Sequence, residues 1–237
     1  MLAHSNSDEQ AVDALGGLLS TIEGGLIVSC QASAGSPMRH TETIARLAES
    51  ALQGGAVGLR VNGAADIAAV RALTDVPIIG LDKQQGRRRS VITVTDAQVV
   101  ALARAGADVA AVDATAEVFD DVGARVRGAV AATRIAVMAD VSTLDEGLES
   151  WSAGASFVGT TLSGYTPYSR ADLSPDVGLV AELASQGVRV LAEGRFVTPD
   201  DVARAFDAGA FAVVVGGAIT DPVQITRRFA AVTPRAR

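Results

Sequence analysis

Eight short runs rich in β-branched residues recur along this chain, with helix-forming stretches between them. Successive runs begin between 20 and 33 residues apart, which is the length of a strand plus a crossover helix. Eight such units in 237 residues predict an α/β fold, the (β/α)8 or TIM barrel. A doubly wound open sheet is the alternative, but it typically has fewer strands and a glycine-rich first turn, unlike the segment SCQASAG after the first run. The eight runs are Leu26–Cys30, Ala56–Arg60, Pro77–Leu81, Asp108–Asp113, Ile135–Asp140, Ser156–Thr161, Val188–Glu193 and Phe211–Gly216.

An additional helix is predicted before the first strand. Ser7 and Gln10 have the spacing of a capping box, in which two side chains satisfy free backbone N–H groups at a helix start. Apolar residues then recur on one helical face, and we expect this face to cover the bottom of the barrel. Nothing along the chain resembles a linker, so one domain is predicted over residues 1–237, with residues 1–25 as the N-terminal helix and lead-in. The apolar residues are Val12, Leu15, Leu18, Leu19 and Ile22.

Caps and glycines mark further helix boundaries. Thr143 and Glu146 form a second capping box, and Thr198 and Asp221 each precede a proline at the first helical position. A Gly-Ala pair precedes four of the strands, where glycine ends the helix before it. The pairs are Gly55-Ala56, Gly106-Ala107, Gly154-Ala155 and Gly209-Ala210. These signals agree with strands and helices that alternate.

The composition excludes several classes of protein. With 20 Lys and Arg against 27 Asp and Glu, the formal net charge is −7, which argues against nucleic acid as the partner. No apolar run is long enough for a membrane helix, and the first residues lack the basic and then apolar pattern of a signal peptide. We therefore expect a cytoplasmic protein that does not enter a membrane. A single cysteine, Cys30, and two histidines, His4 and His40, exclude an internal disulfide and leave too few ligands for zinc.

The chain contains one lysine, Lys83, against 19 arginines. Arginine stays protonated in proteins, whereas a buried lysine can lose its proton and act as a base or nucleophile. If the third strand continues past Leu81, a period of two points Lys83 into the barrel mouth and Asp82 to the opposite face. Burial there lowers the lysine pKa toward the range that suits a general base. If the strand has already ended, Asp82 can fold back and keep the lysine charged.

Active sites of this fold lie at the carboxyl ends of the strands. Polar residues follow seven of the predicted strands, and a glycine pair follows the eighth. Any one of them could cap a helix or be solvated, but an acid, a base and cations that converge on one face indicate a catalytic site. The glycines after the last two strands let backbone N–H groups approach a phosphate, to which Arg195 adds charge. The rim residues are Gln31, Arg60, Lys83, Asp113, Asp140, Thr161, Glu193 and the Gly216-Gly217 pair.

Two loops and one helix carry further candidates. Tyr165 and Tyr168 lie in the loop LSGYTPYS after the sixth strand, which is either a lid that contacts a sugar or a segment that contacts another subunit. Trp151 is expected in the core, on the helix after the fifth strand. The run Arg87-Arg88-Arg89 is most simply a solvated charge run, although it could steer an anionic substrate.

Eight segments between Leu26 and Phe229 carry a recognisable pattern: LIVSCQA, GGAVGLRVNG, PIIGLDK, ADVAAVDAT, MADVSTL, FVGTTLSGYTPYS, VLAEGR and AVVVGGAITDP. In this order they resemble the N-acylglucosamine-6-phosphate 2-epimerase family, also called the N-acetylmannosamine-6-phosphate epimerases. The resemblance implies a cytosolic barrel without a cofactor. It also implies an enzyme that interconverts N-acetylmannosamine 6-phosphate and N-acetylglucosamine 6-phosphate in amino-sugar or sialic acid catabolism. A homodimer is expected as well.

The resemblance also implies roles for single residues. The family's catalytic lysine and glutamate fall on Lys83 and Glu193, and its sugar-contacting residues fall on Gln31, Arg60 and Asp140. The predicted substrate contacts further include Thr161 and Tyr165, and the predicted phosphate site consists of Gly194, Arg195, Gly216 and Gly217. No metal site is expected. The chain departs from the family at Asp82, at Gln84-Gln85 and over Ala116–Asp121, where members similar to it have an apolar residue, Arg-Asp and a basic stretch.

Three other functions remain open from the sequence. A ribulose-phosphate 3-epimerase-like enzyme would need metal-binding histidines at strand ends, where neither His4 nor His40 lies. An aldolase would use Lys83 as the nucleophile that forms a Schiff base. A non-catalytic sugar-phosphate sensor would keep the phosphate site without needing Lys83 and Glu193 together.

Overall fold

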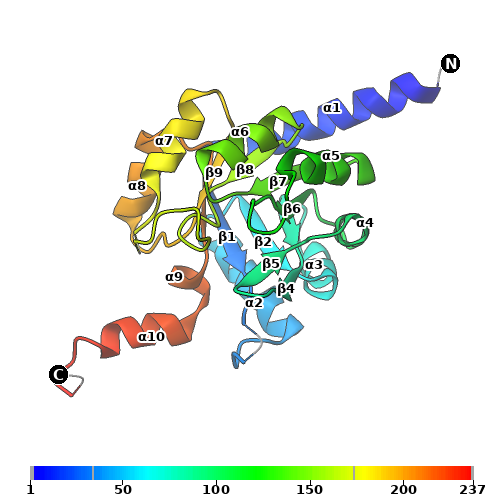
Figure 1. Ribbon diagram of the computed structural model, residues 1–237. Helices are drawn as coiled ribbons and strands as arrows, with labels where there is room; N and C mark the ends of the chain where they lie inside the picture. Colours follow the sequence, from blue (N-terminus) through cyan, green and yellow to red (C-terminus); the bar gives the residue numbers. More distant parts are fainter. Residues whose placement is uncertain (1–2, 34, 173, 236–237) are drawn as a thin grey trace.

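Eight parallel strands close into a barrel in the computed structural model, which describes residues 3–33, 35–172 and 174–235 (Figure 1). Around the barrel the strand order is β1-β10-β9-β8-β7-β6-β3-β2, and each predicted run supplies one strand. The prediction of a TIM barrel is therefore confirmed. The barrel strands are β1 (Leu26–Cys30), β2 (Gly58–Asn62), β3 (Ile78–Leu81), β6 (Val109–Asp113), β7 (Ala136–Asp140), β8 (Phe157–Gly159), β9 (Val190–Glu193) and β10 (Ala212–Val215). A separate two-stranded sheet consists of β4 (Lys83–Gln85) and β5 (Ser90–Ile92).

Helices connect the strands on the outside of the barrel (Figure 1). They are α1 (Ala3–Ile22), α2 (Thr41–Gln53), α3 (Ala64–Arg71), α4 (Asp96–Arg104), α5 (Val122–Ala132), α6 (Leu144–Ser152), α7 (Val177–Ser185), α8 (Pro199–Asp207), α9 (Gly217–Thr220) and α10 (Pro222–Ala230). The predicted capping box of Thr143 and Glu146 begins α6, and the side chains of Thr198 and Asp221 cap α8 and α10. The glycines of the four Gly-Ala pairs have φ angles between 92° and 102°, which glycine adopts without a steric cost.

Alternating side chains of the strands form two apolar layers. Ile79, Leu81, Met138 and Phe157 are buried inside the barrel. Side chains on the opposite face, such as Val61, pack against the surrounding helices. Apolar side chains that face inward therefore fill the barrel interior. Polar groups are left with the carboxyl ends of the strands.

The C-terminal part of helix α1 covers the bottom of the barrel, as predicted, and the rest of the helix projects away from it (Figure 1). Ile22 is 1% exposed and belongs to the apolar cluster of the barrel interior. The predicted start of the helix is wrong, because α1 already begins at Ala3 and Ser7 and Gln10 lie inside it rather than at its cap. No glycine or proline precedes Ser7, so nothing interrupts the helix before the capping pattern. The side chain of Val12 lies outside the described residues.

The third strand ends at Leu81, and Lys83 does not continue its inward face. Lys83 is instead the first residue of β4, which pairs antiparallel with β5 in a hairpin outside the barrel sheet. The cause is Thr93, whose backbone N–H donates to the Asp82 carbonyl at 2.8 Å and whose hydroxyl accepts from the Asp82 N–H at 3.0 Å. The chain after β3 therefore bonds to its own return strand. Of the two possibilities that the sequence left open, the strand that ends before Lys83 is the one observed.

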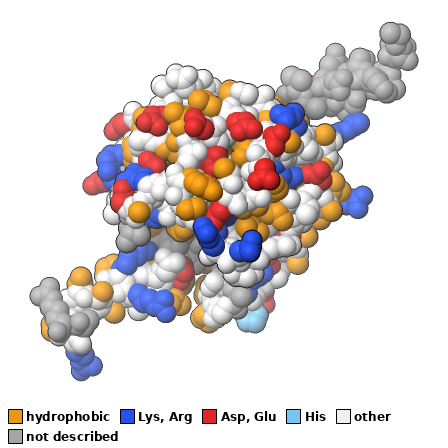
Figure 2. Space-filling view, viewed as in Figure 1, with side chains coloured by type: hydrophobic (Ala, Val, Ile, Leu, Met, Phe, Trp, Pro, Cys, Tyr) orange, Lys and Arg blue, Asp and Glu red, His pale blue; other side chains and the backbone are white. Residues whose placement is uncertain are grey.

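The remaining features of the fold are the position of Trp151, the distribution of charge on the surface and the character of the helices. Trp151 lies on α6, packs against the apolar cluster between barrel and helices, and has the Arg189 guanidinium 5.0 Å from its ring centre, which confirms the core prediction. On the face shown in Figure 2, acidic side chains lie interspersed with basic ones. Among the helices of the described residues, none combines the length and the apolar character needed to cross a membrane.

Candidate active site

Four of the predicted rim residues form one hydrogen-bonded cluster at the carboxyl ends of the strands. The Arg60 guanidinium donates to Glu193 Oε1 at 2.6 Å and to Asp140 Oδ2 at 2.5 Å. The Thr161 hydroxyl lies 2.6 Å from Asp140 Oδ1 and 3.1 Å from Glu193 Oε2. The side chains of Arg60 and Asp140 are completely buried, whereas that of Glu193 is 11% exposed. Glu193 is therefore the charged member of the cluster that a ligand can reach.

The barrel itself positions this cluster. The chain neighbours of Arg60 pack outward against the helices, so Arg60 points into the barrel. Arg60 lies on β2, whereas Asp140 and Glu193 end β7 and β9, so one guanidinium joins strands that are not neighbours. Thr160 fixes the backbone of Glu193, because its hydroxyl accepts the Glu193 N–H at 3.1 Å and donates to the Glu193 carbonyl at 2.9 Å.

Burial and charge shift the protonation equilibria of the cluster. Burial raises the pKa of Asp140 to about 7, with a further increase from the charge of Glu193, while Arg60 and the Thr161 hydrogen bond oppose the shift. Burial by itself lowers the pKa of Arg60, but the two carboxylates outweigh it and the net shift is upward. Arg60 therefore stays a cation, and Asp140 exchanges a proton near neutral pH.

Lys83 stands across the mouth from this cluster. It follows β3, and Glu193 ends β9. These strands are four places apart in either direction around the barrel, the largest separation that eight strands allow. Lys83 is exposed as a whole residue, but protein atoms crowd its amine. Burial lowers the pKa of Lys83, the charge of Arg60 lowers it further, and Glu193 and Asp140 oppose this in part.

Asp82 does not keep Lys83 charged. Its carboxylate accepts a hydrogen bond from the side chain of Gln98 on α4 at 2.7 Å. The backbone N–H of Lys83 donates to Asn62 Oδ1 at 2.8 Å, so the last residue of β2 fixes the start of the hairpin. Asn62 was not among the predicted site residues. Its position two residues after Arg60, on the same face of one strand, is the signal that would have identified it.

The predicted phosphate residues follow two neighbouring strands, β9 and β10. Gly194 has a φ angle of 113° and Arg195 one of 61°, so the chain turns sharply after Glu193. The Arg195 guanidinium stacks on the ring of Tyr165, with Cζ 4.4 Å from the ring centre. Within the described ranges Arg195 makes no ion pair, which leaves its N–H donors available to an anion.

Gln31 and the glycine pair meet between β1 and β10. Gln31 Nε2 donates to the Ser29 hydroxyl at 2.5 Å. Gly216 lies against the same serine, since a Cβ on Gly216 would come within 3.4 Å of Ser29 Cβ. The Thr220 hydroxyl donates to the Ser29 carbonyl at 2.9 Å, which fixes α9 and Gly217 at its start. The sequence did not identify Ser29, a small residue inside an apolar run.

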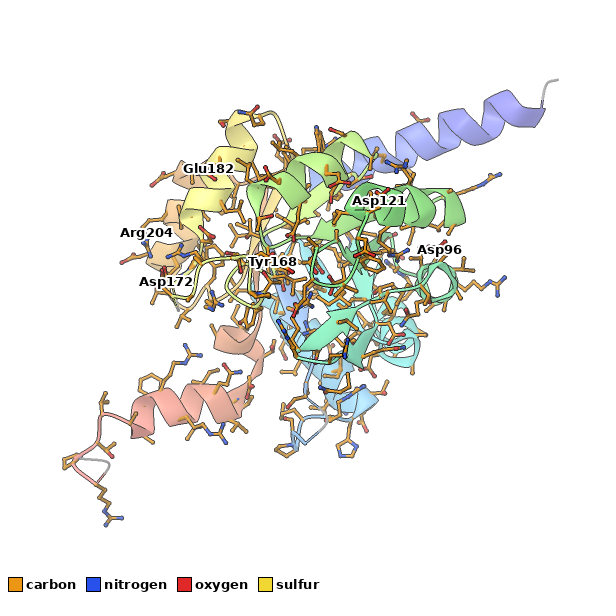
Figure 3. All side chains as sticks on the ribbon, viewed as in Figure 1. Asp96, Asp121, Tyr168, Asp172, Glu182 and Arg204 are labelled. Carbon is orange, nitrogen blue, oxygen red and sulfur yellow. The ribbon has the colours of Figure 1, made fainter. Side chains whose placement is uncertain are left out.

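The loop after β8 places its two tyrosines differently. Tyr165 is 52% exposed and lies under Arg195. Tyr168, labelled in Figure 3, is 62% exposed. The Thr166 hydroxyl donates to the Ser142 hydroxyl at 2.8 Å, which fixes the loop against the residues after β7. The contact between Tyr165 and Arg195 favours a loop that belongs to the site over one that serves only as a subunit contact.

The arginine run is not uniformly solvated. Arg87 and Arg88 are exposed, as predicted, but the Arg89 side chain is 11% exposed and forms ion pairs with Asp113 and Glu117. The prediction fails at Arg89 because Asp113, at the end of β6, is completely buried and a buried carboxylate requires a partner. Throughout the described ranges, no group of three or more His, Cys, Asp and Glu side chains is arranged to hold a metal ion.

A family model and two relatives that match this chain name the same activity. The model of the NanE family, described as "Putative N-acetylmannosamine-6-phosphate epimerase", matches residues 44–234. The chain belongs to this family. A relative from Caldanaerobacter subterraneus subsp. tengcongensis, named "Putative N-acetylmannosamine-6-phosphate 2-epimerase", is 42% identical over 219 residues, or 90% of this chain and 92% of the relative. A relative of the same name from Yersinia pestis is 45% identical over 207 residues, or 87% of this chain and 88% of the relative.

One solved structure agrees with membership of the NanE family, and a second shares the fold. The N-acetylmannosamine-6-phosphate 2-epimerase from Clostridium perfringens superposes with a TM-score of 0.84 at 39% identity, over 91% of this chain and 96% of that chain. Thiamine phosphate pyrophosphorylase from Pyrococcus furiosus has a TM-score of 0.58 at 16% identity, over 89% of this chain and 93% of that chain, and shares the fold alone. The predicted family resemblance is thereby confirmed.

Proposed function

We propose that this protein is a 2-epimerase that interconverts N-acetylmannosamine 6-phosphate and N-acetylglucosamine 6-phosphate in amino-sugar or sialic acid catabolism. Membership of the NanE family, whose members carry that name, supports the substrate. The observation that carries the mechanism is that Lys83 and Glu193 follow strands on opposite sides of one mouth. Inversion of a carbon centre needs a proton removed from one face and another delivered to the opposite face, and two groups so placed provide this.

The chemistry follows from the bond that breaks. The two sugars are isomers that differ at C2, so no electrons are transferred to or from the substrate and no redox cofactor is needed. The C2–H bond is acidic only in the ring-opened sugar, where the C1 aldehyde accepts the electron pair as an enolate. One of Lys83 and Glu193 removes the C2 proton, and the other returns a proton to the opposite face as the carbonyl re-forms. In the reverse direction the two groups exchange roles.

The buried cluster supports the Glu193 side of this reaction. Arg60 holds one oxygen of Glu193 and stabilises its carboxylate after proton transfer. The Thr161 hydroxyl, which lies within hydrogen-bond distance of Asp140 and of the other Glu193 oxygen, provides a path for a proton between the two carboxylates. The pKa of Asp140, raised to about 7 by burial, suits such an exchange at neutral pH.

The phosphate group is bound between the ends of β9 and β10 in this proposal. Arg195 supplies charge, and Gly194, Gly216 and Gly217 supply backbone N–H groups. The phosphate is remote from C2, so its binding energy serves positioning.

We expect Arg195→Ala to raise KM for the 6-phosphorylated sugar about tenfold or more, with a smaller effect on an unphosphorylated analogue. Equal losses on both sugars would show that Arg195 has another role.

A proton NMR assay in D2O tests the whole proposal. Purified protein with N-acetylmannosamine 6-phosphate should produce N-acetylglucosamine 6-phosphate and replace hydrogen by deuterium at C2. Treatment with EDTA should leave the rate unchanged. Inactivation by borohydride in the presence of substrate would instead indicate a Schiff-base aldolase, and phosphate-sugar binding without C2 exchange would indicate a sensor.

The last helix supports the expected homodimer. In a TIM barrel the eighth helix packs on the barrel, but not one of the residues in α10, all of which are described, is buried. Figure 1 shows α10 extending away from the barrel. Phe229 shares the face of Ile225 and is 74% exposed, and Val232, in the turn after the helix, is 67% exposed. Beside β1 the barrel has an unfilled groove of about 250 Å³. Its lining consists of Leu26, Val28, Leu47, Ser50, Ala51, Gly54, Ala56, Ile219 and Thr220.

We infer that α10 of one copy packs into this groove of a second copy, and the reverse. Light scattering should then give the mass of a dimer for the wild-type chain and of a monomer for Phe229→Asp. Thr226→Asp, which adds the same charge at an exposed position of the same helix, should stay dimeric. A dimeric Phe229→Asp protein would contradict the exchange of helices. A cytoplasmic location stays a prediction.

A further inference from the structure

The hairpin that carries Lys83 is a sheet separate from the barrel, so no strand pairing with the barrel fixes the orientation of its tip. Its base is held by the bonds of Asp82 with Thr93 and of Lys83 with Asn62. These bonds hold one end of the hairpin, and the hairpin could still tilt about that end. The direction of the Lys83 side chain depends on that tilt, so a second attachment at the other end of the hairpin is needed.

Arg89 provides this second attachment. Its Nη1 donates to Asp113 Oδ2 at 2.7 Å and to the Ser90 carbonyl at 3.0 Å. Its Nη2 donates to Asp113 Oδ1 at 3.1 Å and to the Thr115 hydroxyl at 2.8 Å, and its Nε donates to Glu117 Oε2 at 2.9 Å. An arginine has five N–H donors, so all of them are used. A paired contact with one carboxylate also fixes the plane of the guanidinium.

The other end of this attachment is rigid. Asp113 is the last residue of β6 and is completely buried. It also accepts the Thr115 hydroxyl at 2.7 Å and the backbone N–H of Ile92 at 3.4 Å. Ile92 is the residue directly opposite Lys83 in the hairpin. Asp113 thus contacts the hairpin at its tip, through Arg89, and beside Lys83, through Ile92.

We propose that Arg89 and Asp113 are positioning residues that hold the β4–β5 hairpin so that the Lys83 amine stays at the barrel mouth, facing Glu193. This rests on the proposed role of Lys83 as the group that moves the C2 proton. In this proposal neither residue contacts the substrate. A positive charge alone cannot hold the hairpin in this way. A lysine at position 89 would have three donors on one atom and could not make the planar, paired contact with a carboxylate that the guanidinium makes.

The single lysine of the chain makes the position of Lys83 measurable without any substrate. Protein grown with ε-13C-labelled lysine gives one side-chain signal, and its pH titration reports the pKa of that amine. Arg60 on β2, Glu193 on β9 and Asp140 on β7 are the charged groups that act on it from the barrel. In the wild-type protein burial and Arg60 keep the pKa below that of a free lysine. A hairpin that tilts away loses both influences.

Arg89→Gln should therefore move the Lys83 titration upward, toward that of a free lysine, and Asp113→Asn should do the same while it preserves the shape of the buried side chain. For epimerisation both variants should lose about tenfold or more in kcat at pH 7 with less than about a twofold change in KM, because the phosphate site is untouched. Arg88→Gln removes the same charge from an exposed neighbour and should change neither the titration nor kcat.

The outcomes separate the two proposals. An unshifted Lys83 titration in folded Arg89→Gln and Asp113→Asn proteins would overturn the positioning role, whatever the enzyme catalyses. A shifted titration in a protein without epimerase activity would support the anchor and contradict the proposed function. If Arg89→Gln does not fold, the titration of Asp113→Asn decides. Arg89→Lys, which keeps the charge without the planar pair, should lose kcat as Arg89→Gln does, and a wild-type kcat there would also overturn the proposal.

Discussion

The two sides of the barrel mouth are held in place by different means. On one side Glu193 ends a barrel strand and shares Arg60 with the buried Asp140, so the site and the barrel depend on the same contacts. On the other side Lys83 stands on a hairpin outside the sheet, and Arg89 attaches that hairpin to β6. We therefore expect a change at Lys83 to remove the proposed chemistry and leave the fold intact, and a change in the cluster to affect both.

The largest expected effect tests the Lys83 side. Lys83→Arg keeps the positive charge but cannot accept the C2 proton, so we expect the rate of epimerisation to fall about 1,000-fold. Thermal unfolding and the affinity for a phosphate ligand should stay close to those of the wild-type protein. If the variant retains about a tenth of the wild-type rate, Lys83 does not act on the C2 proton.

Glu193→Gln tests the other side and should affect both properties. The amide cannot deliver a proton, so epimerisation should fall about 100-fold while C2 exchange through Lys83 continues in D2O. Arg60 loses a charged partner, so the free energy of unfolding should fall by about 2 kcal/mol. Denaturant titration beside the NMR assay measures both. Equal losses of exchange and epimerisation, with ligand affinity intact, would mean that Glu193 tunes Lys83 or opens the sugar ring.

The smallest expected effect is a dependence of the free energy of unfolding on pH, caused by the buried carboxyl of Asp140. Because burial raises the pKa of Asp140 to about 7, the folded protein keeps a proton that the unfolded chain releases near pH 4. The contribution of Asp140 to stability therefore decreases as the pH rises between these values, by at most about 1.4 kcal/mol per pH unit. The difference in unfolding free energy between wild type and Asp140→Asn should fall from pH 5 to pH 7. A constant difference would contradict the raised pKa of Asp140.

The positions of the site residues on the rim could be predicted from the sequence. Strand period and spacing place Arg60, Asp140 and Glu193 at strand ends, and the barrel brings strand ends together whatever their partners are. Their pairing could not be predicted. Arg60 contacts residues 80 and 133 positions away, and these contacts depend on how the strands close around the barrel. Sequence distance and local pattern contain no such information.

The errors share a physical cause as well. Lys83 and Arg89 lie in a segment whose local pattern fits both a continued strand and a charged loop. The chain turns back where Asp82 bonds to Thr93, and Arg89 is mostly buried because the buried Asp113, 24 residues later, requires a partner. Ser7 and Gln10 match a capping box, but a helix starts where the chain before it stops being helical, and no breaker precedes them. The apolar face of α10 is visible in the sequence, but its packing partner is not.

The left-handed backbone of Arg195, with a φ angle of 61°, lowers the stability of the fold but places a cation where we expect the ligand to bind. A residue with a side chain pays about 1 kcal/mol or more in this region, which glycine avoids. The chain keeps an arginine there, directly after Gly194, where the turn delivers its guanidinium onto Tyr165. Arg195→Gly should therefore give a slightly more stable protein that holds its phosphorylated ligand poorly. Selection for thermal tolerance alone would be expected to remove this cation, and selection for growth on the sugar to restore it.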